Sequence, residues 1–117
     1  MREEITVEVR YLTEVKELIG REQEEFKIGE GGKIEDLWQK ILERHTSEIE
    51  SAGYVNLQTR EPYLYDPGAP RPSSLVFFFQ RKGLPGCRMI WWYDGIKTEL
   101  NDGDVVFMAP PTAGCGG

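Results

Sequence analysis

The stretch Asn101-Asp102-Gly103-Asp104-Val105-Val106-Phe107-Met108-Ala109-Pro110-Pro111-Thr112-Ala113-Gly114-Cys115-Gly116-Gly117 ends the chain. Its first residues are a turn signal, because Asn, Asp and Gly favour tight turns. The apolar run from Val105 to Met108 predicts a strand, and two prolines end it because proline cannot donate to a sheet ladder. The residues that follow are too small to pack a core, and glycine passes through slots that exclude other residues. We therefore expect a domain over 1–109 and a flexible tail over 110–117, with the Gly117 carboxylate as the functional group.

The beginning of the chain predicts two paired strands. Ile5, Val7, Val9 and Tyr11 alternate with polar residues, which is the period-2 pattern of a strand with one buried face. We expect a polar loop over 13–23 and a short second strand around Phe26 and Ile28. Strands joined this closely usually pair antiparallel.

The segment 33–50 predicts one amphipathic helix. Its apolar residues recur at helical spacing, with acidic residues in the first turn where the helix dipole favours them. These residues are Ile34, Leu37, Trp38, Ile41, Leu42, His45 and Ile49. His45, at the edge of this stripe, is expected to be packed or half-exposed rather than catalytic.

The rest of the chain predicts an irregular insertion and two more strands. Four prolines and a glycine within 62–72 exclude a long regular element over about 53–74, and Tyr63, Leu64 and Tyr65 are expected to fasten this loop. The fully apolar run 75–79 predicts a central strand, and 88–93 predicts another from its aromatic and β-branched content. The connection that follows is expected to be anchored by Ile96 and Leu100, whose side chains pack into the core. One main helix packed on one face of a mixed four- to five-stranded sheet makes an α+β domain.

The last strand is apolar on both of its faces, although one helix can cover only one face of a sheet. Val105 and Phe107 alternate with Val106 and Met108. Either the long insertion covers the second face, or that face is an apolar docking patch beside the root of the tail.

Composition narrows the classes of function. The chain has 117 residues and a net charge of −6, whereas nucleic-acid binders concentrate Lys and Arg on one face. No apolar run approaches the roughly 20 residues of a membrane span. A single histidine and two cysteines without metal-ligand spacing disfavour a metal site, a metallohydrolase or a serine hydrolase. We expect a cytoplasmic protein that binds neither nucleic acid nor membrane.

With this order of elements, the chain resembles the MoaD/ThiS-type β-grasp sulfur carriers, which are related to the Urm-type ubiquitin-like modifiers. The resemblance rests on the opening strand and loop over 5–20, the helix over 33–45, the turn over 98–104, and the apolar strand that runs into Pro110-Pro111 and a terminal Gly116-Gly117. The Leu18/Gly20 loop and the double proline favour MoaD over ThiS. The implied fold is the ubiquitin-like β-grasp.

The resemblance implies a chemistry at the C-terminus. An ATP-dependent activating enzyme of MoeB/ThiF type would adenylate Gly117, and a persulfide donor would convert it to a thiocarboxylate. The sulfur would then be delivered to a pterin precursor inside a MoaE-like large subunit of molybdopterin synthase, in molybdenum or tungsten cofactor biosynthesis. The chain itself would bind no cofactor, since ATP belongs to the activating enzyme. Gly116 would give clearance around the reacting group. The partner-binding residues would be Phe107, Pro110, Pro111, Thr112, Ala113, Gly114 and Cys115.

The chain departs from the family pattern in the length of its tail and of two loops. The role of Cys115 and the function of the whole chain each leave alternatives open. Thr112 to Cys115 make the tail two residues longer than is usual in the family, and the insertion and the turn 81–87 are also longer. Cys115 is either a small tolerated side chain or a thiol for redox control. The chain could instead be a modifier joined to lysines or supplying sulfur for tRNA thiolation, or a β-grasp binding module with an inert tail.

Overall fold

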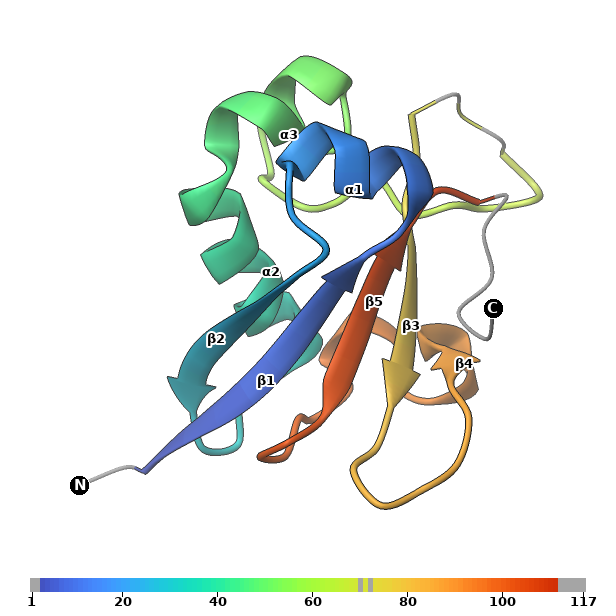
Figure 1. The fold of residues 1–117 in the computed structure, drawn as a ribbon. Helices are drawn as coiled ribbons and strands as arrows, with labels where there is room; N and C mark the ends of the chain where they lie inside the picture. Colours follow the sequence, from blue (N-terminus) through green and yellow to red (C-terminus); the bar gives the residue numbers. More distant parts are fainter. Residues whose placement is uncertain (1–2, 70, 72, 112–117) are drawn as a thin grey trace.

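The computed structural model describes residues 3–69, 71 and 73–111. Its five-stranded sheet has the order β2-β1-β5-β3-β4, which Figure 1 shows edge to edge. The strands are β1 (Glu4–Tyr11), β2 (Gln23–Gly29), β3 (Val76–Gln80), β4 (Arg88–Met89) and β5 (Val105–Ala109). The β1–β5 pair is parallel and the other three pairs are antiparallel. The sheet is therefore mixed, with β5 at its centre.

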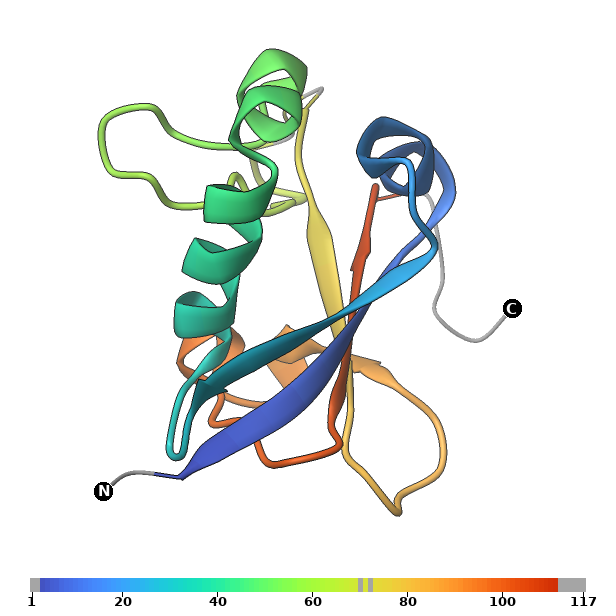
Figure 2. The ribbon, with the colours of Figure 1, turned by 60° about the vertical axis from the view of Figure 1, so that its left-hand side comes forward.

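Helix α2 (Ile34–Arg44) lies along one face of the sheet, as Figure 2 shows. Its apolar stripe is buried, because residues three and four apart share a face of a helix. The stripe packs into the main core with the inward residues of β1, including Val7 and Val9, which are 0% exposed. Leu100 is also buried in this core and Ile96 packs against it, as the sequence predicts.

The predicted loop over 13–23 is wrong, because a helix lies there. Helix α1 (Thr13–Ile19) buries Val15 and Ile19, and Gly20 ends it with φ of +82°. Glycine adopts this left-handed conformation at no steric cost, which makes it a common helix terminator. The polar segment thus has its own buried face.

The single helix predicted over 33–50 is two helices, α2 and α3 (Thr46–Ala52). His45 separates them with φ −126° and ψ 38°, which are not helical angles. Ile49 of α3 is still 0% exposed, so the apolar stripe continues across the break into the main core.

The strand predicted over 88–93 is also shorter than expected. Only Arg88 and Met89 pair with β3, and the chain then turns into a 3₁₀ helix, η1 (Ile90–Trp92), followed by η2 (Gly95–Lys97). Ile90 is buried in the main core, whereas Trp91 and Trp92 are exposed.

The insertion 53–74 is held against the rest of the domain through Tyr63, Leu64 and Tyr65, as expected. Val55 pairs with Pro62 and Leu64 with Leu75 through isolated bridges. Leu64 packs against the main core, while Tyr65 packs on the other face of the sheet. Within the part of the chain that is described, no helix has the length and apolar character needed to cross a membrane.

Candidate functional site

The end of β5 carries the candidate site, because the chain leaves the sheet there. Its register pairs Met108 with Tyr11 of β1 and Ala109 with Val76 of β3. The Leu12 N–H also donates to the Met108 carbonyl oxygen at 3.1 Å. Pro110 is still buried and Pro111 is exposed, so the path to the surface begins between the two prolines. Because β5 is held by strands on both sides, it gives the following segment a fixed starting point.

A buried carboxylate fixes the other end of β5. Asp104 is 0% exposed and accepts the N–H groups of Lys82 at 3.1 Å and Asn101 at 2.7 Å. The Arg81 guanidinium lies 3.1 Å from the same carboxylate. Gly103 before it has φ of +87°, a conformation that L side chains rarely adopt. The turn predicted from the sequence is therefore built around Asp104, which locks the start of β5 to the turn after β3.

The second face of the sheet carries a small apolar cluster of Val76, Phe78, Phe107 and Ala109, each at most 9% exposed. Leu12, Tyr65 and Met89 pack at its edges, and the Arg10 guanidinium lies 5.7 Å from the centre of the Phe107 ring. Tyr65 belongs to the insertion, so the loop does contribute to covering this face. Phe107, a predicted partner-binding residue, is 5% exposed, and its ring is a structural neighbour of the tail root.

The predicted site residues fall into two groups. The structure places Phe107 within β5 and buried Pro110 directly after that strand, with Pro111 following at the surface. Thr112, Ala113, Gly114, Cys115, Gly116 and Gly117 lie outside the described residues. The site therefore consists, as far as it is described, of the root from which the predicted tail starts.

Sequence reasoning missed a buried polar cluster around Glu24. This carboxylate is 6% exposed and accepts hydrogen bonds from the Tyr11 hydroxyl at 2.7 Å and Arg44 Nη1 at 3.2 Å. His45 Nε2 is also in hydrogen-bond contact with Glu24, and His45 Nδ1 lies 3.4 Å from Glu48. The cluster joins β1 and β2 to the break between α2 and α3, so it is a structural tie rather than an accessible catalytic centre.

The cluster shifts the pKa values of its members. Burial by itself raises the pKa of Glu24, but hydrogen bonds from Tyr11, His45 and Arg44 outweigh burial and lower that pKa below its ordinary value. Burial and the hydrogen bond to Glu24 raise the pKa of the Tyr11 hydroxyl well above its usual range. Glu24 is thus held ionised and Tyr11 neutral. The sequence does indicate that Glu24 is buried, because Glu24, Phe26 and Ile28 occupy alternate positions of one strand and therefore share its inward face.

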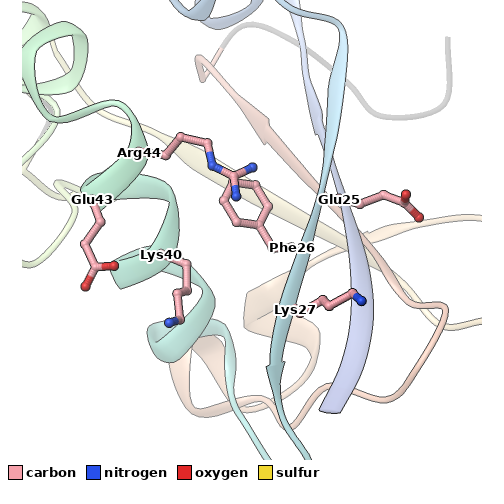
Figure 3. A pocket seen from close by; sticks show the side chains of 6 residues that line it. All are labelled: Glu25, Phe26, Lys27, Lys40, Glu43 and Arg44. Carbon is pink, nitrogen blue, oxygen red and sulfur yellow. The ribbon is translucent and has the colours of Figure 1, made fainter.

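A cavity of about 580 Å³ lies between α2 and β2, and Figure 3 shows its lining. The Arg44 guanidinium lies over the Phe26 ring, 4.3 Å from its centre. Lys40 and Glu43 come from α2, whereas the side chains of Glu25 and Lys27 point from β2 away from the helix. Arg44 is already held by Phe26 and Glu24, so this cavity offers one stacked cation and a solvated rim rather than a set of converging reactive groups.

Sequence reasoning also missed an aromatic surface at η1. Trp91 is 54% exposed and Trp92 is 69% exposed. The Arg88 guanidinium lies over the Trp92 ring, 5.0 Å from its centre. Three aromatic residues in succession, from Trp91 to Tyr93, were the signal, because a strand with one buried face cannot bury neighbouring residues together.

At the level of sequence, no protein-family model matches the chain and no curated protein gives a significant match. Solved structures do match. The structure of a putative molybdopterin converting factor, subunit 1, from Pyrococcus furiosus is 24% identical, with a TM-score of 0.60, over 92% of this chain and 99% of that one. Small archaeal modifier protein 1 from Methanosarcina acetivorans is 17% identical, with a TM-score of 0.63, over 97% and 99%. The HVO 2177 protein from Haloferax volcanii is 21% identical, with a TM-score of 0.60, over 96% and 88%.

At these identities the likeness is one of fold. It extends over nearly the whole of this chain and of the matched chains. The α+β class and the mixed sheet with its main helix on one face are confirmed, although two further short helices accompany that helix. The chain has the ubiquitin-like β-grasp fold, as do a molybdopterin converting factor subunit and a small archaeal modifier, and the resemblance to the sulfur carriers and modifiers is confirmed at that level.

Proposed function

We propose that this chain is a sulfur carrier whose Gly117 carboxylate is adenylated and converted to a thiocarboxylate. The sulfur would be delivered to a pterin precursor inside the large subunit of a molybdopterin synthase. The observation that carries the proposal is the placement of β5, which is fixed between β1 and β3. It leads through buried Pro110 to exposed Pro111, directly before the small residues 112–117. A β-grasp domain with a central last strand is a rigid support for such a tail. The fold shared with a putative molybdopterin converting factor subunit gives independent support.

The chemistry requires activation because a carboxylate is a poor acyl donor. A carboxylate oxygen of Gly117 would attack the α-phosphorus of ATP in the activating enzyme, and pyrophosphate would leave. A persulfide sulfur would then attack the acyl-adenylate carbonyl and displace AMP. A thiol would cleave the resulting acyl disulfide, forming a new disulfide and releasing the thiocarboxylate. The catalytic groups belong to the partner enzymes, and this chain supplies the acyl group and its positioning.

Intact-mass measurement tests the proposal. We expect incubation with the organism's own ATP-dependent activating enzyme, ATP and a cysteine-persulfide donor to exchange one oxygen of the chain for sulfur. The matched control lacks Gly116 and Gly117. It should keep its thermal unfolding midpoint, because both described apolar clusters lie before Pro110, and it should stay unmodified. An unmodified full-length chain would contradict the proposal.

A modifier function is the second candidate, because the chain also shares its fold with small archaeal modifier protein 1. In that case the Gly117 acyl group would be joined to a lysine amine of another protein. Peptides in which a lysine carries a residue derived from this chain's C-terminus would favour the modifier. Adenylation is common to both functions, so only the fate of the acyl group separates them.

A further inference from the structure

A hollow at the edge of the sheet brings together two segments that are far apart in sequence. It has a volume of about 500 Å³ and is lined by Leu64, Tyr65, Asp66, Pro67 and Trp91. The first four residues belong to the insertion 53–74, and Trp91 belongs to η1. We call these five residues the edge hollow. The insertion is longer than the pattern of the sulfur carriers that the sequence resembles, and it meets η1 at this one place.

The strand register places the edge hollow at the end of the sheet from which the tail leaves. Leu64 bridges to Leu75, the residue before Val76, and Val76 pairs with Ala109 at the end of β5. Trp91 lines the same hollow as Leu64, so it lies at this end of the sheet. The Tyr65 N–H donates to the Leu75 carbonyl oxygen at 2.8 Å, which holds the insertion at the same level. Only β3 separates this edge from β5, so two strand spacings, roughly 10 Å, lie between them.

The exposure of its aromatic rim distinguishes the edge hollow from the second face of the sheet. Val76, Phe78, Phe107 and Ala109 on that face are already buried. Trp91 and Trp92 instead present most of their area to solvent, whereas Trp38 in the core is 1% exposed. Tryptophan is enriched at the energetic centres of protein interfaces, where a partner desolvates it. The hollow and its rim are therefore an exposed apolar surface near the end of β5.

Charge defines the chemistry of the occupant. Asp66 is the one ionised group in the lining, and its Oδ1 accepts the Gly68 N–H at 2.9 Å. Neither Asp66 nor Asp94, which follows η1, forms an ion pair with any residue of the described ranges, and the chain carries a net charge of −6. Arg88 already stacks over Trp92 on the rim, so the acidic side of the hollow is the side at Asp66. The matching surface is an apolar side chain beside one Lys or Arg that faces Asp66.

We propose that the edge hollow docks the ATP-dependent activating enzyme, through an apolar side chain beside a basic one. The inference rests on the proposed function, and it names the activating enzyme because adenylation is required whether the chain carries sulfur or modifies proteins. An enzyme that holds Gly117 must lie within about 28 Å of Ala109, the extended length of eight residues. The edge hollow is well inside that reach. The insertion and η1 would thus select the partner by adding contacts that the tail alone does not make.

The test follows tryptophan residues directly. The chain is labelled with 5-fluorotryptophan, and its three ¹⁹F resonances are assigned with W38F, W91F and W92F. Unlabelled activating enzyme, added without ATP, should shift or broaden the resonances of Trp91 and Trp92 and leave that of buried Trp38 unchanged. Resonances that move with the concentration of the chain alone would identify a second copy as the occupant, and would overturn the proposal.

Kinetics provide the second measurement. Trp91→Ala and Asp66→Lys should each lower kcat/KM for thiocarboxylate formation by about tenfold or more, the effect typical of an interface centre. Leu57→Ala is the matched control, because Leu57 is 66% exposed on the loop 56–60 outside the edge hollow, and its kcat/KM should stay within about twofold. Full activity of both variants, with unmoved resonances, would overturn the docking proposal and leave the carrier function standing. A wild-type chain that the enzyme never modifies would overturn both.

Discussion

Glu24 holds three elements together through one carboxylate. Its partners are Tyr11 on β1 and Arg44 and His45 at the junction of α2 and α3. The sequence predicts that His45 is packed or half-exposed, and the structure shows it packed, at 8% exposed. Its partner 21 residues away cannot be derived from helical spacing. The alternation of residues along β2 shows that the Glu24 side chain points inward. Which side chains it contacts depends on how α2 packs against the sheet.

Glu24→Gln should destabilise the fold by about 1–3 kcal/mol, because a neutral amide cannot satisfy the Tyr11, Arg44 and His45 donors together. Urea unfolding measures the free energy. Glu25→Gln is the matched control, since Glu25 is exposed on the same strand and points away from α2. Equal midpoints for the two variants would show that the buried cluster contributes nothing to stability.

The lowered pKa of Glu24 predicts a direction for the pH dependence of stability. A group whose pKa is lower in the folded state stabilises the fold above its unfolded-state pKa, which is about 4.5 here. That contribution is lost as pH falls from there through the folded-state pKa. The difference in unfolding free energy between wild type and Glu24→Gln should therefore be largest near neutral pH and shrink below about pH 4.5. A difference that grows on acidification would contradict this account.

At the scale of elements, the turn into β5 decides where the tail begins. Asp104 ties this turn to Lys82 and Arg81, and Gly103 supplies the left-handed residue. This part of the fold could be predicted from the sequence, because its turn residues and its apolar strand are contiguous. The fixed position of β5 between β1 and β3 follows from long-range pairing.

Gly103→Ala should destabilise the fold by about 1–2 kcal/mol, because a Cβ at φ of +87° is strained and would collide with the Lys82 side chain. Gly29→Ala is the control: Gly29 has no positive φ, and a Cβ there would meet nothing within 4 Å. Thermal unfolding of the two variants measures the difference. If Gly29→Ala were the more damaging substitution, the turn would not be the constrained element.

The elements that sequence reasoning misplaced share a physical cause. Helix α1 has apolar residues at helical spacing, but its seven residues are too few for periodicity to outweigh its polar content. The break at His45 depends on side-chain contacts with β2, so the continuous stripe conceals it. After Met89 the chain leaves the sheet, since three consecutive aromatic residues cannot all face one core. Each error lies where tertiary contacts overrode a local pattern.

At the scale of the whole molecule, the β-grasp domain is a support with its core complete before Pro110. The fold class, the main helix and the apolar last strand before the two prolines could be predicted from the sequence. The edge hollow could not, because it forms between 64–67 and Trp91, which only the folded sheet brings together. The domain therefore offers a fixed origin for the tail and a separate surface beside it.

The central claim is that sulfur is attached at Gly117, and the position of the new sulfur tests it most directly. Trypsin cleaves after Lys97, and residues 98–117 contain no further Lys or Arg, so one peptide holds the entire C-terminus. After treatment with the activating enzyme, ATP and a persulfide donor, the account predicts that this peptide exchanges one oxygen for sulfur at Gly117. The Cys115→Ser variant should show the same exchange. A peptide that instead gains a sulfur without losing oxygen, and only when Cys115 is present, would contradict the account.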